Sequence, residues 1–171
     1  SFAKELISIA KENKLNLITS SPFVFDVNIR ALKDYCCNFS KTKMETAGVF
    51  MRRLTDDSTK KESLFWDFLP SDISILDYIY GINKILESYW FYIDNNEQSL
   101  WLNLVLETSN VKELKVVFNY SSTSPFKSRF IEIKNDNTYI NYDLLNNTPV
   151  QIFNKVPNKN KFIFSSYNSV I

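Results

Sequence analysis

The side chains that most often do chemistry are scarce in this chain. None of the 171 residues is histidine, so the commonest general base and metal ligand is missing. A Ser-His-Asp or Cys-His catalytic pair therefore cannot be built from this chain. The two cysteines, Cys36 and Cys37, are adjacent and lack the C-x-x-C spacing of a redox motif. We therefore expect reduced thiols, no catalytic residue and no metal site.

Phosphate binding is also unsupported by the sequence. A loop that cradles phosphate needs several glycines close together, because backbone N–H groups must approach the anion. Only Gly48 and Gly81 occur, 33 positions apart in the printed sequence. Hence we expect no cofactor, and we expect the protein not to be an enzyme.

One histidine-free chemistry stays open. Tyr, Arg and Glu side chains can together cleave RNA, and Arg52, Arg53, Tyr120 and Glu132 would be the candidates here. Nothing in their spacing supports a shared site, so a nuclease toxin is only a second alternative.

The charge distribution points to a partner surface. The whole chain has a net charge of +1, yet residues 44–110 hold eleven acidic and five basic side chains, a net −6. An acidic face of this kind either is simply solvated or meets a basic partner. The candidate partner-binding residues are five aspartates near a predicted loop and helix start and one tryptophan on a strand: Asp56, Asp57, Asp67, Asp72, Asp77 and Trp101.

A long helix followed by two strands is the clearest structural pattern. After Pro70, Ser71 and Asp72, which together are typical of a helix start, apolar residues recur every three or four positions as far as Ile93. The spacing predicts a helix over about 72–94. Residues 100–107 and 114–120 then alternate in polarity, which predicts an antiparallel hairpin covered by that helix.

The remaining segments predict further hairpins and a shorter helix. Residues 2–14 suit an N-terminal helix, and residues 23–29 alternate as a strand would. Residues 46–54 and 63–69 predict one hairpin, and residues 129–134 and 138–144 another. We therefore predict an α+β fold in one domain, 1–171: an antiparallel sheet of hairpins packed against the long central helix and the shorter N-terminal helix.

The sequence contains no apolar run near the ~20 residues that span a bilayer. Its first residues also lack the basic-then-apolar layout of a signal peptide. Together with the expected free thiols, this predicts a cytoplasmic protein with no membrane contact.

The strand that begins at Trp101 and the strand that ends with Phe118 and Tyr120 resemble the YezG-like family of bacterial antitoxins, or immunity proteins. The resemblance covers residues 46–122. In that family a helix precedes a strand opening with Trp, and the next strand ends in an apolar-x-Phe-x-Tyr pattern. It implies a non-catalytic monomer that neutralises a cognate toxin domain, often a nuclease, in a one-to-one complex without contacting nucleic acid itself. The first alternative is a small secretion chaperone that binds an effector segment.

Overall fold

The structure, a computed structural model, describes residues 2–17, 21–38, 44–56, 63–146, 149–155 and 162–167. Within these ranges the helical segments are α1 (Phe2–Glu12), η1 (Pro22–Phe25), α2 (Val27–Asn38) and α3 (Leu64–Tyr80). The strands are β1 (Met44–Asp56), β2 (Ile82–Tyr92), β3 (Ser99–Thr108), β4 (Val111–Ser121), β5 (Thr123–Lys134), β6 (Thr138–Asp143), β7 (Val150–Lys155) and β8 (Phe162–Tyr167).

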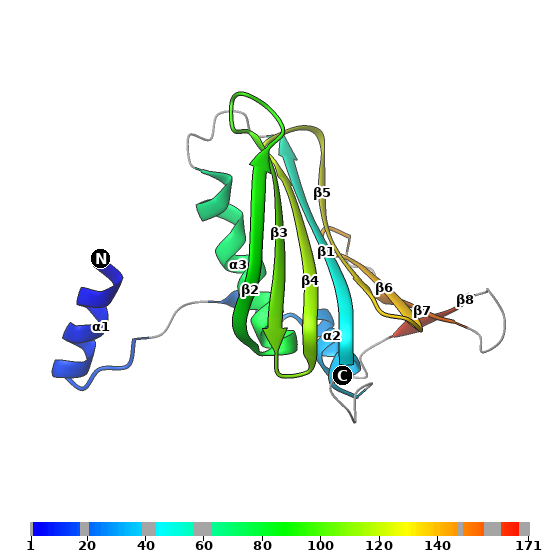
Figure 1. Cartoon of the computed structure of the whole chain (residues 1–171), viewed down its shortest axis with the longest axis horizontal. Helices are drawn as coiled ribbons and strands as arrows, with labels where there is room; N and C mark the ends of the chain where they lie inside the picture. The colour runs from blue at the N-terminus through cyan, green and yellow to red at the C-terminus, as the bar shows by residue number, and fades with distance from the viewer. Residues whose placement is uncertain are drawn as a thin grey trace.

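One mixed sheet organises the molecule, with strand order β2-β3-β4-β1-β5-β6-β7-β8 among the described residues. β1 pairs with β4 in parallel, and every other described pair is antiparallel. In Figure 1 helices α2 and α3 lie behind the sheet, and its near face carries no helix. We call the near side the open face and the other the helix face.

Along the strands, every second side chain points to the helix face, and these side chains form the core there. In β3 every second residue from Leu100 to Thr108 is buried, and the residues between them are only partly buried. Side chains of α3, such as Phe68 and Ile75, pack against this face and are at most 1% exposed. Among the described helices, α2 and α3 thus cover the sheet on one side only.

The predicted central helix over 72–94 is wrong. Its apolar stripe belongs to two elements: Ile75 and Ile79 are buried on α3, whereas Leu86 and Tyr89 are exposed on β2, an edge strand. Gly81 separates the two elements with a left-handed φ of 65°, a conformation in which other residues are strained.

The helix also begins earlier than predicted. α3 starts at Leu64, so Pro70 lies inside the helix, and the predicted strand 63–69 and its hairpin with 46–54 are wrong. The strand at 46–54 is real, but β1 pairs with β4 and β5 instead. A proline at this position removes one backbone hydrogen bond of the helix, whereas Leu64 and Phe68 of the same helix are buried in the core.

Two other hairpins are confirmed. β3 pairs with β4, and β5 with β6, both antiparallel and joined by short turns. The predicted strand 23–29 is wrong, because η1 and the start of α2 occupy it. Helices and strands are both present, but the predicted architecture, an antiparallel sheet on one long helix, is replaced by a mixed sheet on two helices.

The predicted N-terminal helix is confirmed as α1, which stands apart from the sheet in Figure 1. Its apolar residues are exposed: Phe2 by 75%, Leu6 by 37% and Ile9 by 46%. That 1–171 forms one domain stays a prediction. In the part of the chain that the structure describes, no helix combines the length and apolarity needed to cross a membrane.

Candidate functional site

A polar cluster lies between α3 and the helix face of the sheet. We call it the α3 polar cluster: Arg53, Ser71, Asp72, Tyr120 and Arg129. Three of these residues come from the sheet. Arg53 on the central strand β1 is the direct cross-strand neighbour of Tyr120 on β4 and of Arg129 on β5. α3 supplies Ser71 and Asp72, which face this row.

Asp72 is the buried centre of the cluster, with only 3% of its surface exposed. The Tyr120 hydroxyl donates a hydrogen bond of 3.0 Å to Oδ2, and Arg129 Nη2 lies 3.5 Å from Oδ1. Burial raises the pKa of the Asp72 carboxyl, against the opposing effect of Arg129, Arg53 and the Tyr120 hydrogen bond. Burial and the neighbouring carboxylate raise the pKa of Tyr120 well above its ordinary value, so the phenol stays a donor.

The two arginines are held by aromatic rings as well as by polar groups. Arg53 Nη1 donates to Ser71 Oγ at 3.0 Å, and its guanidinium lies 4.3 Å from the centre of the Phe68 ring. Arg129 stacks 4.1 Å above Phe23 of η1. Its Nη2 is buried, and its 3.5 Å contact with Asp72 is an ion pair. Burial and the like charge of Arg53 lower the pKa of Arg129.

The cluster can therefore bind a polar or anionic group. Two guanidinium groups face one buried carboxylate, which leaves an excess of one positive charge when all three are ionised. Asp67 and Ser71, one helical turn apart on α3, are only partly buried. A carboxylate can accept hydrogen bonds from a bound molecule, and a hydroxyl can both accept and donate them.

The six residues predicted to bind a partner do not form one surface. Asp72 is buried in the cluster, and Asp67 is partly buried on the first turn of α3. Asp77 is exposed and accepts a hydrogen bond from the Ile82 backbone N–H at 2.8 Å, which caps the end of the helix. Asp56 is exposed at the end of β1, and Asp57 lies outside the described residues.

Trp101, the sixth of these residues, lies on the open face of β3. It is partly buried, and its ring centre lies 6.1 Å from that of Phe50 on β1. No observation tests whether it contacts a partner.

The residues considered for a histidine-free nuclease are divided between two faces. Arg53 and Tyr120 are neighbours on the helix face. Arg52 and Glu132 lie on the open face, where Arg52 stacks on Phe130 at 4.9 Å. Among the described residues, no three Cys, Asp or Glu side chains are grouped as metal ligands would be.

Sequence reasoning missed Arg129 altogether. The only signal available was a charged residue within an otherwise alternating strand, and it did not reveal that β5 lies beside β1. Tyr120 was singled out for its strand pattern and not for its hydrogen bond to Asp72.

No protein-family model matches the chain, and no curated protein matches it in sequence. Its fold, however, is similar to that of solved oxidoreductases and dehydrogenases. One is a UDP-N-acetylglucosamine 3-dehydrogenase from Acidithiobacillus ferrooxidans, with 15% identity, a TM-score of 0.68, and coverage of 97% of this chain and 52% of that one.

Two further structures are similar to the chain. An inositol dehydrogenase homologue from Azotobacter vinelandii, solved with NADH and myo-inositol, has 8% identity and a TM-score of 0.70 over 96% of this chain and 46% of its own. An oxidoreductase from Pseudomonas syringae has 9% identity and a TM-score of 0.72, and the match covers 96% of this chain and 45% of that one. The chain thus spans about half the length of the structures it matches.

These likenesses overturn the predicted YezG-like immunity protein. The chain has the fold of about half of an oxidoreductase, and neither a family model nor a curated sequence supports an antitoxin. The expectation of a protein that is not an enzyme is contradicted by the same matches. The resemblance failed because Trp101, Phe118 and Tyr120 are ordinary strand residues that many sheets place at these positions.

Proposed function

We propose that this chain supplies the substrate-binding half of a nicotinamide-dependent oxidoreductase. The observation that supports this most is the fold likeness, which spans nearly all of this chain and about half of each dehydrogenase. Two of those proteins are named for a sugar nucleotide or inositol, so we propose a polyol or sugar as substrate. The cytoplasmic location belongs to the same proposal and is supported by the free thiols of Cys36 and Cys37.

The dinucleotide itself does not fit the described residues. Dinucleotide phosphates bind where a glycine-rich turn leads from a parallel strand into the N-terminus of a helix. Here Gly48 lies inside β1, Gly81 lies at the C-terminal end of α3, and among the described strands only β1 and β4 are parallel. We therefore assign the dinucleotide to the half of the enzyme that this chain does not match.

The α3 polar cluster is the proposed substrate contact. Arg53 and Arg129 would orient a polar or anionic group of the substrate, and Ser71, held by Arg53 at 3.0 Å, would donate or accept a hydrogen bond. Asp67, one turn earlier on α3, is the proposed acceptor for the proton of the hydroxyl group that is oxidised.

The exposed apolar side of α1 supports a two-part enzyme. Phe2, Leu6 and Ile9 together form an apolar surface that a protein rarely leaves in water. We propose that the dinucleotide-binding half covers it.

The experiment uses the native protein that carries this sequence. NADH affinity is measured by nicotinamide fluorescence, and turnover is measured with NAD and myo-inositol or UDP-N-acetylglucosamine. Asp67→Asn is expected to lower kcat about 100-fold, as loss of a general base does, with NADH affinity within twofold. Glu87→Gln, on the exposed edge strand β2, is the matched control and should change neither quantity.

Two results would overturn the proposal. In one, the chain expressed alone binds NADH saturably at micromolar concentration. In the other, the native protein binds no nicotinamide dinucleotide and oxidises neither substrate.

A further inference from the structure

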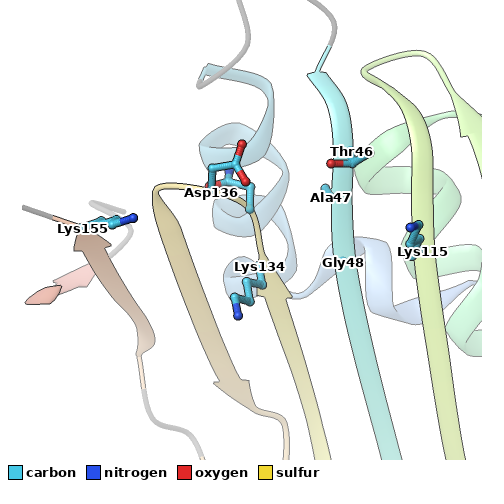
Figure 2. A pocket seen from close by; sticks show the side chains of 8 residues that line it. Thr46, Ala47, Gly48, Lys115, Lys134, Asp136 and Lys155 are labelled. Atoms are coloured by element: carbon cyan, nitrogen blue, oxygen red, sulfur yellow. The ribbon is translucent and has the colours of Figure 1, made fainter. Parts of the chain in front are cut away.

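A pocket of about 600 Å³ opens on the open face of the sheet, opposite the α3 polar cluster. Figure 2 shows it between the first residues of β1 and the turn from β5 to β6, with Lys155 of β7 on the far side. Its lining combines three lysines with small and polar residues: Thr46, Ala47, Gly48, Lys115, Lys134, Asn135, Asp136 and Lys155.

Strand register fixes the two lysines at the centre of this pocket. Gly48 on β1 is the direct cross-strand neighbour of Lys115 on β4 and of Lys134 on β5. Since neighbouring strands lie about 4.8 Å apart, the two lysine backbones are about 10 Å apart with a glycine between them. Two ammonium groups at that spacing can reach one phosphate or diphosphate from both sides.

The glycine has no structural explanation at this position. Its φ does not lie in the left-handed region, and a Cβ built there would meet its nearest atom, the Lys134 carbonyl oxygen, at an ordinary 3.8 Å. A glycine inside a central strand is destabilising relative to alanine. Glycines inside strands occur at bulges, at tight bends and where a ligand or another backbone approaches closely.

The charges of the pocket are poorly balanced. Asp136 is the one acidic residue of the lining, against three lysines. Within the described ranges no ion pair involves Lys115, Lys134 or Lys155, all of which are exposed. Glu132, two residues before Lys134 on the same strand face, lies beside Tyr139: burial and this carboxylate raise the pKa of Tyr139 to about 12.

We infer that this pocket binds the phosphate groups of a phosphorylated small molecule. The volume lies within the ~300–1,000 Å³ that small-molecule sites occupy. Lys115, Lys134 and Lys155 supply the positive charge, the Thr46 hydroxyl supplies a further donor, and Gly48 leaves the floor open. The site lies on the other face of the sheet from the α3 polar cluster and is independent of the proposed oxidoreductase activity.

The test is titration calorimetry with inorganic pyrophosphate at low salt. The expected result is saturable binding of one pyrophosphate per chain. Lys134→Gln and Lys115→Gln should each weaken it about tenfold, the worth of one charge-assisted hydrogen bond. Lys84→Gln, which removes the same charge from the exposed edge strand β2, should change it less than about twofold because a distant surface charge is screened.

Gly48→Val provides a second, uncharged test. The side chain would fill the floor of the pocket, so pyrophosphate binding should be lost while the unfolding midpoint does not fall. Absence of saturable binding to the unsubstituted chain at millimolar pyrophosphate would overturn the inference. Equal weakening by Lys84→Gln and Lys134→Gln would also overturn it, since that is the signature of nonspecific attraction.

Discussion

Replacing Asp72 by asparagine tests the physical account of the α3 polar cluster most directly. The substitution keeps the shape of the side chain and removes a charge that is 3% exposed and 3.5 Å from Arg129. Two attractive contacts are changed at once, because Tyr120 also donates to this carboxylate at 3.0 Å. The arginine beside it is then left buried with no opposite charge.

The expected loss of stability follows from that distance. Two unit charges 3.5 Å apart attract by about 5 kcal/mol at an effective dielectric constant of 20. Desolvation of both groups offsets much of this attraction, but removing one partner of a buried pair still costs about 3–5 kcal/mol. Since the Arg129 side chain is 17% exposed, we expect about 3 kcal/mol, which lowers Tm by about 6–12 °C in a chain of this size.

A double-mutant cycle isolates the pair from other effects of the substitution. Asp72→Asn, Arg129→Met and the double variant are unfolded in urea, and their free energies of unfolding are compared. The double variant should be about 2 kcal/mol more stable than the sum of the single losses predicts, because it leaves no unpaired charge.

The exposed pair Lys112–Glu45 provides the matched control. Its atoms are closer, at 2.6 Å, but its side chains are 58% and 75% exposed, so the coupling should be below about 1 kcal/mol. If the Asp72 and Arg129 variants are additive within about 0.5 kcal/mol, the buried ion pair contributes no coupling and this reasoning is refuted.

Two other predictions concern one glycine and the thiols. Gly81→Ala should lose about 1–2 kcal/mol in urea unfolding, because φ is 65° and the new Cβ would lie 2.8 Å from Ser109 Oγ. Burial raises the pKa of Cys36 to about 12, so iodoacetamide should label exposed Cys37 and spare Cys36, as read by mass spectrometry of the native protein.

The parts of the fold that the sequence predicted are local. The β3–β4 and β5–β6 hairpins follow from alternation over a few residues and from short turns, and both are present. The parallel pairing of β1 with β4 has no such signal. The two strands are far apart in the chain, with α3 and two other strands between them, so no pattern within either strand specifies the partner.

The helix error has one cause. Apolar residues keep a three-and-four spacing across Gly81, although the backbone changes from helix to strand there. A glycine within such a pattern indicates a helix end as readily as a tolerated defect, and the β-branched and aromatic residues of β2 were further support for a strand. Interpreting Gly81 as a helix end places the boundary between helix and strand at this residue, where the structure has it.

The two sites could not be predicted from the sequence because each is assembled across strands. Tyr120, Arg53 and Arg129 form a row on the helix face, and no two of them belong to the same strand. The composition showed no histidine and no glycine-rich loop, and both observations still bear on function. They exclude a dinucleotide loop from this chain, but they do not exclude its serving as the other half of a dehydrogenase.

The central strand β1 connects the two proposed sites. Its residues alternate between faces, so Arg53 faces α3 while Gly48, five positions earlier, faces the open side. A shift of one residue in the pairing of β1 would therefore move both groups to the wrong faces. Because the two rows lie on opposite sides of the sheet, pyrophosphate binding and substrate turnover should respond to separate sets of variants. A Lys134 variant that lowered the unfolding midpoint as much as Asp72→Asn would show that the lysine pocket is part of the structural core instead.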